Sequence, residues 1–183
     1  EAKGKYLAFL DVDDLWLPQK LEEQLRVFKN SKKKLAFVYG RTEVLYQNNP
    51  SRNFIHLKDE VLPSGNIFPL LAKENFITFS SVIVDKNIFF ECGGFPKHFK
   101  SSTDHWIYLN MSKKYDVGAS QSLCCKYRLH NNNTTYSHLI RGAKESLEAL
   151  NNFDKDEVIK IGLKHHKVNL AIMNIKEYNF FGA

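Results

Sequence analysis

Cysteine is scarce in this sequence, and no apolar run has the length of a membrane span. Three cysteines (Cys92, Cys124 and Cys125) are too few for a disulfide framework, and no C-x-x-C spacing suggests zinc. A reducing compartment is the simplest interpretation. Without a transmembrane run or a signal-peptide pattern, we expect a cytoplasmic location. The five prolines and nine glycines form no low-complexity linker.

Charge of one sign is also not concentrated anywhere. The net charge of +6 is spread over small groups, mainly 32–34, 113–114 and 164–167. This pattern favours anionic lipid or nucleotide partners, and solvated helix faces are the alternative for each group. No nucleic-acid-binding motif accompanies these groups, so we expect no nucleic-acid partner. The hydrophobic share of 43% and the charged share of 25% are ordinary for a globular chain of 183 residues.

An acidic segment follows the first apolar run. Tyr6–Leu10 has the length and composition of a buried strand, and it ends in Asp11, Asp13 and Asp14. Pro18 then opens a helix, because a missing N–H costs nothing at the first helical position. Clustered carboxylates repel one another, and a divalent cation such as Mg²⁺ removes that cost when it binds one or two of them together with substrate phosphates. The alternative is a solvated acidic turn.

Strand and helix patterns follow one another along the rest of the chain. Strands are expected at 35–39, 42–46, 54–57, 79–84, 117–120 and 123–130. Helices are expected at 18–28, 67–73, 85–92, 103–115 and from 138 onward, with a break near 151–154. In the first helix, Leu17, Leu21, Leu25 and Phe28 form one apolar stripe, which predicts an amphipathic helix. Asp85 is expected to cap the helix that follows it.

Three later residues are candidates for chemistry. Asp104 follows Ser101-Ser102-Thr103 at a predicted helix start, where the helix dipole favours an ionised carboxylate that can act as a general base. The alternative is a capping residue without chemistry. Arg128 and His130 occupy alternate positions at a strand end, where they could meet a diphosphate or a metal. For His130 the alternative is an ordinary hydrogen-bonded histidine.

The order of these segments resembles the family 2 glycosyltransferases, which share the GT-A fold. Residues 4–21 match the family segment G-x-Y-x-x-F-L-D-x-D-D-x-W-x-P-x-K-L. The later landmarks of the family are matched by 80–84, 93–95, 103–104 and 127–130. The resemblance implies an α/β, GT-A-like (Rossmann-like) mixed sheet flanked by helices over residues 1–136, followed by a helical extension over 137–183.

The resemblance also implies an inverting transfer of a sugar from a nucleotide diphosphate donor, most simply a UDP-sugar, to an acceptor hydroxyl. Asp11 would contact the nucleoside, Asp13 would hold Mn²⁺ or Mg²⁺ on the diphosphate, Asp14 would support that loop, and Asp104 would be the base. Arg128 joins the donor site in this interpretation. His130 joins Asp13 as a metal ligand.

The resemblance further implies a place for this reaction in the cell. It suggests a glycan or lipid-linked acceptor in bacterial surface polysaccharide synthesis. It also suggests that the protein acts at the inner face of the cytoplasmic membrane and associates with that membrane peripherally.

The sequence departs from the family pattern at two points. Thr103 stands where many relatives have Glu before the base. The N-terminal part that carries the nucleotide pocket is missing, which predicts a fragment whose first strand is a sheet edge. An inactive remnant or a non-catalytic binding module of such a transferase therefore remains the alternative function. Trp16 is either core or part of the acceptor side.

A strand ending in Asp-x-Asp also opens phosphatases of the haloacid dehalogenase class. Those enzymes need Thr or Val four residues after the first Asp, where this chain has Leu15. They also lack the Trp16-x-Pro18-x-Lys20 continuation. A phosphatase is therefore the weaker alternative.

Overall fold

The computed structural model describes residues 2–130, 133 and 138–181, and it describes side chains as far as residue 175. The expected boundary between residues 136 and 137 lies outside these residues. Internal contacts divide the chain into two compact units. Unit 1 comprises Glu1–Ile67, Ile77–Gly94 and Met111–Asn131, and unit 2 comprises Phe68–Phe76, Phe95–Asn110 and Asn132–Ala183.

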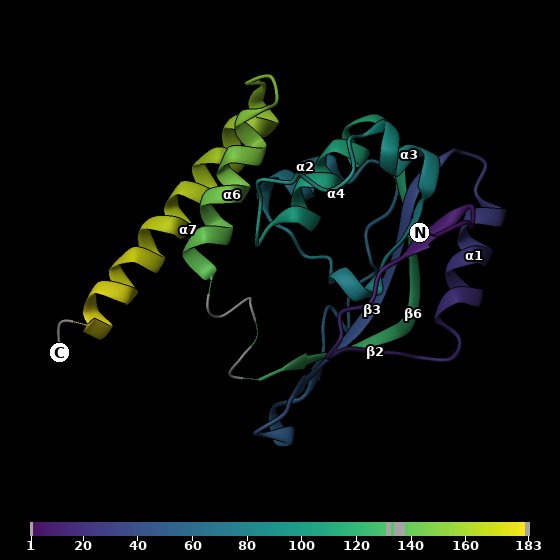
Figure 1. Ribbon diagram of the computed structural model, residues 1–183, viewed down its shortest axis with the longest axis horizontal. Helices are drawn as coiled ribbons and strands as arrows, with labels where there is room; N and C mark the ends of the chain where they lie inside the picture. Colours follow the sequence, from purple (N-terminus) through teal and green to yellow (C-terminus); the bar gives the residue numbers. More distant parts are fainter. Residues whose placement is uncertain (1, 131–132, 134–137, 182–183) are drawn as a thin grey trace. The chain divides into compact units, whose positions relative to one another are not determined.

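Unit 1 is built on a mixed sheet (Figure 1). Within the described residues its strands are β1 Tyr6–Ala8, β2 Leu15–Trp16, β3 Leu35–Tyr46, β4 Phe54–Ile55, β5 Ile83–Asp85 and β6 Asp116–Leu129. The strand order is β1-β5-β3-β6-β2, and β4 pairs with β3 outside this path. The β3–β6 pair is parallel and the other pairs are antiparallel. This arrangement agrees with the expected mixed sheet, and β1 lies at its edge.

Helices complete both units. The α-helices are α1 Lys20–Asn30, α2 Phe68–Lys73, α3 Lys86–Glu91, α4 Thr103–Lys114, α6 Leu139–Asn151 and α7 Glu157–Phe181, and the short 3₁₀ helices are η1 Pro50–Arg52 and η2 Phe79–Ser81. The Asp85 carboxylate accepts hydrogen bonds from Asn87 N at 3.0 Å and Ile88 N at 3.1 Å, which confirms the predicted cap.

Four expectations about the strands are corrected. The run Tyr6–Leu10, expected as a buried strand, forms β1 over Tyr6–Ala8 only and contains no buried residue. The segments expected at 117–120 and 123–130 form one strand, β6. The segments expected at 35–39 and 42–46 form one strand, β3, that runs through Gly40 without interruption. Glycine is required there because a Cβ at Gly40 would lie 2.7 Å from Cys124 Sγ. Cys124 is an extra residue in β6, where the register steps from Arg41↔Leu123 to Thr42↔Cys125, and such a bulge re-aims the strand that carries it. Residues 79–81 form η2 instead of beginning a strand.

The predicted apolar stripe of α1 is also corrected. Leu21 and Leu25 are each 41% exposed, whereas Lys20 and Gln24 are buried. The buried amine is tolerated because it donates to Gln24 Oε1 at 2.7 Å and lies 4.7 Å from the centre of the Trp16 ring. Burial lowers the pKa of Lys20 to about 8. A polar contact therefore decides which face of α1 packs against the sheet. The hydrophobic periodicity of the sequence does not reveal this contact.

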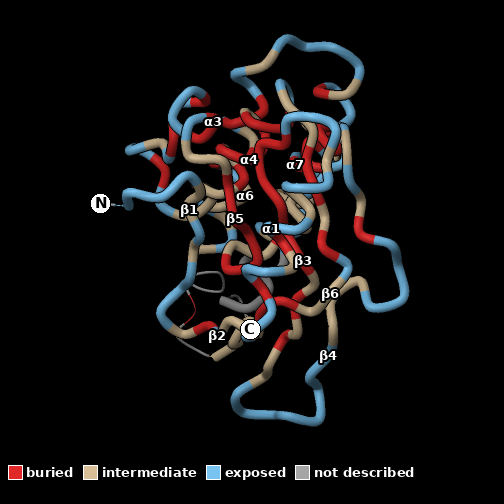
Figure 2. Tube along the Cα trace, turned by 90° about the vertical axis from the view of Figure 1, so that its right-hand side faces the viewer, coloured by how far each residue is buried: buried red, intermediate tan, exposed pale blue. Residues whose placement is uncertain are grey.

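The core of unit 1 follows the central strands. Figure 2 shows buried residues concentrated along β3 and β5. Phe37, Val38 and Val84 have no exposed surface, and Val27 and Phe28 of α1 pack against the cluster that contains Val38. The near-continuous apolar character of these strands is expected for strands covered on both faces.

Unit 2 packs α7 against α6 and α2 (Figure 1). Gly162 of α7 allows a close approach, because a Cβ there would lie 2.4 Å from the Ala72 carbonyl oxygen of α2. His105 is buried beneath these helices, with Nδ1 3.0 Å from Ser146 Oγ and Nε2 2.8 Å from the Leu71 carbonyl oxygen. The ring of His166 lies 5.5 Å from that of His105, centre to centre. The interior of unit 2 therefore contains two neighbouring buried imidazoles.

Acid should destabilise unit 2 through these histidines. Burial lowers the pKa of His105 to about 4, and burial together with the charges of His105 and His165, opposed by Glu74, lowers that of His166 to about 4. The unfolded chain then binds more protons between about pH 4 and 6.5, so this stability is complete above 6.5 and is lost as the pH falls. We expect a loss of about 2 kcal/mol per histidine near pH 5, measured as the free energy of urea unfolding.

His98 supplies the control for this measurement. It pairs with Glu148 at 3.3 Å and its side chain is 62% exposed. His166→Gln should flatten the pH dependence, and His98→Gln should leave it unchanged. An equal stability of the natural chain at pH 7 and pH 5 would contradict the prediction.

Candidate functional site

The acidic loop between β1 and β2 is anchored on one buried serine. Ser80 has no exposed surface; its hydroxyl accepts a hydrogen bond from Asp11 N at 3.0 Å, and its carbonyl oxygen accepts one from Trp16 Nε1 at 2.9 Å. The loop closes on itself through Asp14 N, which donates to the Asp11 carbonyl oxygen at 3.1 Å. Ser80 therefore holds the loop at both ends.

The end of β6 meets the same loop. Arg128 N donates to Asp14 Oδ1 at 3.0 Å, and Arg128 Nε donates to the Asp13 carbonyl oxygen at 2.9 Å. His130 Nε2 lies 2.9 Å from Asp13 Oδ2. Four of the residues singled out in the sequence thus lie together in unit 1, namely Asp13, Asp14, Arg128 and His130.

The three carboxylates of the loop occupy different environments. Asp14 is buried, and burial raises its pKa against the opposing effects of the Ser80 hydroxyl and the Arg128 amide. Asp13 is half-buried beside His130, and Asp11 is exposed. Asp14 therefore supports the loop from within, while Asp11 and Asp13 are the carboxylates that a ligand can reach.

Trp16 belongs to the support of the loop. Its indole N–H is bonded to Ser80, and its ring lies against the Lys20 amine. Gln24 continues this network, because its Nε2 donates to the Val38 carbonyl oxygen at 3.1 Å and to the Ser81 carbonyl oxygen at 2.6 Å. These contacts favour the core interpretation of Trp16.

Asp104 lies in unit 2, in the first turn of α4. Asn75 Nδ2 donates to Asp104 Oδ2 at 2.9 Å. Burial raises the pKa of Asp104, and hydrogen bonds from the His105 amide and from Asn75 oppose the rise. The carboxylate is therefore oriented by a neutral amide and has a higher proton affinity than an exposed aspartate.

The segment before α4 is held in place by a side chain of α6. The Glu145 carboxylate accepts hydrogen bonds from the backbone N–H groups of Lys100 at 2.9 Å, Ser101 at 2.8 Å and Ser102 at 2.8 Å. Three backbone donors on one carboxylate hold this turn rigidly. The helix that carries Asp104 therefore begins at a defined place within unit 2.

Ser80 and Asn75 were not predicted as site residues. Ser80 begins the segment 80–84, which resembles one of the family's later landmarks, and Asn75 lies in a short connection. Neither residue type is diagnostic by itself, because serine and asparagine are common in turns. Only their contacts with Asp11 and Asp104 identify them.

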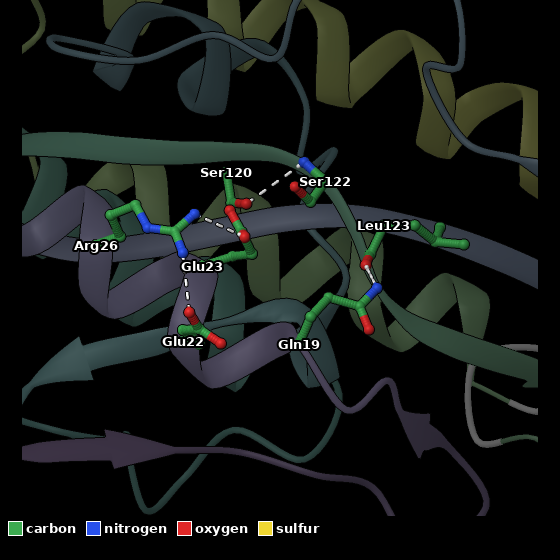
Figure 3. Close-up of polar contacts among 7 residues, drawn as sticks. All are labelled: Gln19, Glu22, Glu23, Arg26, Ser120, Ser122 and Leu123. Atoms are coloured by element: carbon green, nitrogen blue, oxygen red, sulfur yellow. Dashed lines mark hydrogen bonds and ion pairs between the residues drawn. The ribbon is translucent and has the colours of Figure 1, made fainter.

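An open groove of about 600 Å³ lies elsewhere in unit 1, between α1 and β6. None of the acidic-loop residues, nor Arg128 or His130, is among the described residues that line it. Figure 3 shows that its Arg26 side chain is paired with Glu22 at 2.9 Å and Glu23 at 2.8 Å. Because the groove is lined by none of the residues singled out in the sequence, it is not the candidate site.

The Asp13–His130 pair offers one oxygen and one nitrogen ligand. Among the residues that the structure describes, no group of three or more His, Cys, Asp or Glu side chains could hold a metal ion. Mg²⁺ needs no such group when a substrate supplies phosphate oxygens, since one or two protein carboxylates suffice. Asp13 therefore fits a metal that binds together with a phosphate-bearing ligand, and the His130 nitrogen lies beside it.

The chain is similar to known glycosyltransferases. A family model described as "Glycosyltransferase like family 2" matches residues 1–169. The UDP-Glc:alpha-D-GlcNAc-diphosphoundecaprenol beta-1,3-glucosyltransferase WfgD of Escherichia coli is 26% identical over 181 residues, which cover 98% of this chain and 66% of WfgD. The putative teichuronic acid biosynthesis glycosyltransferase TuaG of Bacillus subtilis is 27% identical over 147 residues, which cover 79% of this chain and 54% of TuaG. The chain thus spans two thirds or less of these relatives.

A solved structure shares the fold. The crystal structure of S. aureus TarS 1-349 matches with a TM-score of 0.57 and 13% identity, over 95% of this chain and 50% of that one. The match, together with the mixed sheet and its flanking helices, confirms the expected α/β, GT-A-like fold.

Removing the Ser80 hydroxyl should loosen the acidic loop. In Ser80→Ala the Asp11 amide loses its acceptor, and we expect the free energy of urea unfolding to fall by about 1–3 kcal/mol. Hydrogen exchange at the Asp11 amide should become faster. Ser81→Ala is the matched control, because Ser81 Oγ donates to the Thr78 carbonyl oxygen at 2.7 Å instead of contacting the loop. Equal protection of the Asp11 amide in both variants would refute the anchoring role.

Proposed function

The chain belongs to the glycosyltransferase-like family 2, and from this premise we propose that it carries the donor-phosphate and base residues of an inverting glycosyltransferase. The reaction moves a sugar from a nucleotide diphosphate donor to an acceptor hydroxyl. The observation that carries the proposal is the convergence of Asp13, Asp14, Arg128 and His130 at one end of the sheet. Ligands in open α/β sheets bind beyond the carboxyl ends of strands, and these residues lie after β1 and at the end of β6.

On the donor side, Asp13 and His130 would hold Mg²⁺ or Mn²⁺. When bound, the metal would stabilise the charge that develops on the leaving diphosphate. Arg128 adds a positive charge at the same place, and Asp11 is exposed where the nucleoside would contact it. Asp14 stays within the protein and keeps this loop in position.

On the acceptor side, Asp104 takes the proton from the acceptor hydroxyl. The acceptor oxygen forms its bond to the anomeric carbon as the bond from that carbon to the diphosphate oxygen breaks. Attack from the opposite side inverts the anomeric configuration. The raised pKa of Asp104 suits this role, because a base works best when its pKa approaches the working pH. Asn75 orients the carboxylate.

The substrates proposed are a UDP-sugar and a glycan or lipid-linked acceptor in surface polysaccharide synthesis. WfgD is named for a UDP-glucose donor and a diphosphoundecaprenol-linked acceptor, and TuaG for teichuronic acid biosynthesis. A lipid-linked acceptor would place the protein at the inner face of the cytoplasmic membrane, with peripheral attachment.

One observation favours a second function for the residues described. The strand β1 lies at the edge of the sheet, so its outer side is open to a further strand. A non-catalytic binding module or an inactive remnant of a transferase would have the same architecture. Family membership gives no support to the phosphatase alternative.

Metal-dependent nucleotide binding tests the donor side. UDP with Mn²⁺ is titrated calorimetrically into this chain and into a longer version that includes any native sequence preceding residue 1. We expect binding that needs the metal and that weakens at least about tenfold, or about 1.4 kcal/mol, in Asp13→Ala. The matched control is Asp116→Ala, which removes a carboxylate paired with Lys33 at 2.7 Å. If neither chain binds any nucleotide diphosphate with metal, the binding-module alternative replaces the proposal.

The pH profile of transfer tests the base. With a donor identified, Asp104→Asn should lower kcat by about 10²–10⁴-fold and leave the affinity for nucleotide unchanged. Asn75→Ala should move the acidic limb of the kcat profile to higher pH, because the lost hydrogen bond had lowered the pKa of a base that acts when deprotonated. An unshifted limb in Asn75→Ala would mean that Asn75 does not act on Asp104.

A further inference from the structure

The helix α7 carries an exposed apolar stripe. Ile161, Val168, Ile172 and Ile175 are 53%, 51%, 46% and 61% exposed. Their spacings of seven, four and three residues place them on one side of the helix. From the first to the last, the stripe runs for about 21 Å along the helix axis. Scattered exposed aliphatic residues are ordinary, but an aligned row of this length marks an interaction surface.

The opposite side of α7 is already occupied within unit 2. Ile159 and His166 are buried, and Gly162 meets the Ala72 carbonyl of α2. This packing sets the rotation of the helix about its axis. The apolar stripe therefore points away from α2 and α6 and cannot be moved inward without breaking that contact.

Positive charge accompanies the stripe. Lys160, Lys164 and Lys167 are exposed, and together with Leu163 and Val168 they line a shallow hollow along the same helix. No aspartate or glutamate occurs between residues 158 and 175. The two acidic residues of α7, Glu157 and Glu177, lie before and after this range. The outward side of α7 thus combines aliphatic side chains with three exposed lysines.

We propose that this side of α7, defined by Lys160, Ile161, Lys164, Lys167, Val168, Ile172 and Ile175, binds the surface of an anionic lipid bilayer. Aliphatic residues enter the boundary between headgroups and acyl chains, and lysines beside them extend their amines to the anionic headgroups. Because its other side is packed against α2, α7 would lie in the plane of the surface. Among the described helices, none has the length and apolar character of a membrane span. Between Ile161 and Ile175 this side carries no acidic residue, which favours lipid over a protein partner.

This inference deepens the membrane attachment proposed above but rests on α7 alone. It assigns the attachment to unit 2, the unit that also carries Asp104. An enzyme with a lipid-linked acceptor would then hold its base and its membrane contact in the same compact unit.

Vesicle sedimentation tests the surface. The full chain is mixed with vesicles of phosphatidylcholine alone, or of phosphatidylcholine with phosphatidylglycerol, at low and high salt. We expect binding to the anionic vesicles only, weakened by salt. Two variants should each partition onto the anionic vesicles at least about tenfold less than the natural chain, because the surface potential and the buried apolar area both contribute to binding. They are the triple variant Lys160→Gln, Lys164→Gln, Lys167→Gln and the double variant Ile161→Asn, Ile172→Asn.

A charge-matched control distinguishes binding by this surface of α7 from a general electrostatic attraction between the basic protein and the vesicles. Lys29→Gln, Lys32→Gln, Lys58→Gln removes three exposed lysines of unit 1 and should retain vesicle binding. Equal losses in the two lysine variants would overturn the proposal, as would the absence of binding to anionic vesicles. Self-association of the natural chain that the isoleucine variant abolishes, without vesicle binding, would make the face a protein interface.

Nucleotide titration of the same variants keeps the two proposals apart. The α7 variants should bind UDP with Mn²⁺ as the natural chain does, because their changes lie outside the donor residues. Loss of vesicle binding with intact nucleotide binding supports the surface. Failure of the natural chain to bind nucleotide would count against the proposed function and leave the vesicle result to stand by itself.

Discussion

The parallel pairing of β3 with β6 is the constraint on which the rest of unit 1 depends. It runs from Leu35↔Asp116 to Tyr46↔Leu129, and it carries the end of β6 past the acidic loop. The loop reaches the same edge because β2 pairs with β6 at Leu15↔Lys126 and Trp16↔Cys125. Residues more than a hundred positions apart in the sequence are thereby brought within hydrogen-bonding distance.

Hydrogen bonds between buried polar groups hold this loop in one conformation. Ser80 bonds the loop at both ends, and the Lys20 amine is held by Gln24 beneath Trp16. Buried polar groups are costly when unpaired, so a network of this kind tolerates few alternative arrangements. The loop is therefore held in position before any ligand arrives, which reduces the entropy lost on binding.

Unit 2 combines three features on a helical framework. Glu145 fixes the turn before α4, and Asn75 orients Asp104. The outward face of α7 carries both lysines and aliphatic side chains. The paired imidazoles of His105 and His166 lie inside this unit. Their neutral forms are needed for packing, so the unit is suited to near-neutral pH.

The sequence alone determined the family, the class of fold and the placement of most elements, because strand composition, helix periodicity and a dense motif are local properties. It also singled out Asp13, Asp14, Arg128 and His130, which the structure brings together. Only the tertiary structure decided which face of α1 is buried and that Ser80 anchors the loop. Those outcomes depend on hydrogen bonds between segments far apart in the chain, and no pattern of hydrophobicity along one segment records such a partner.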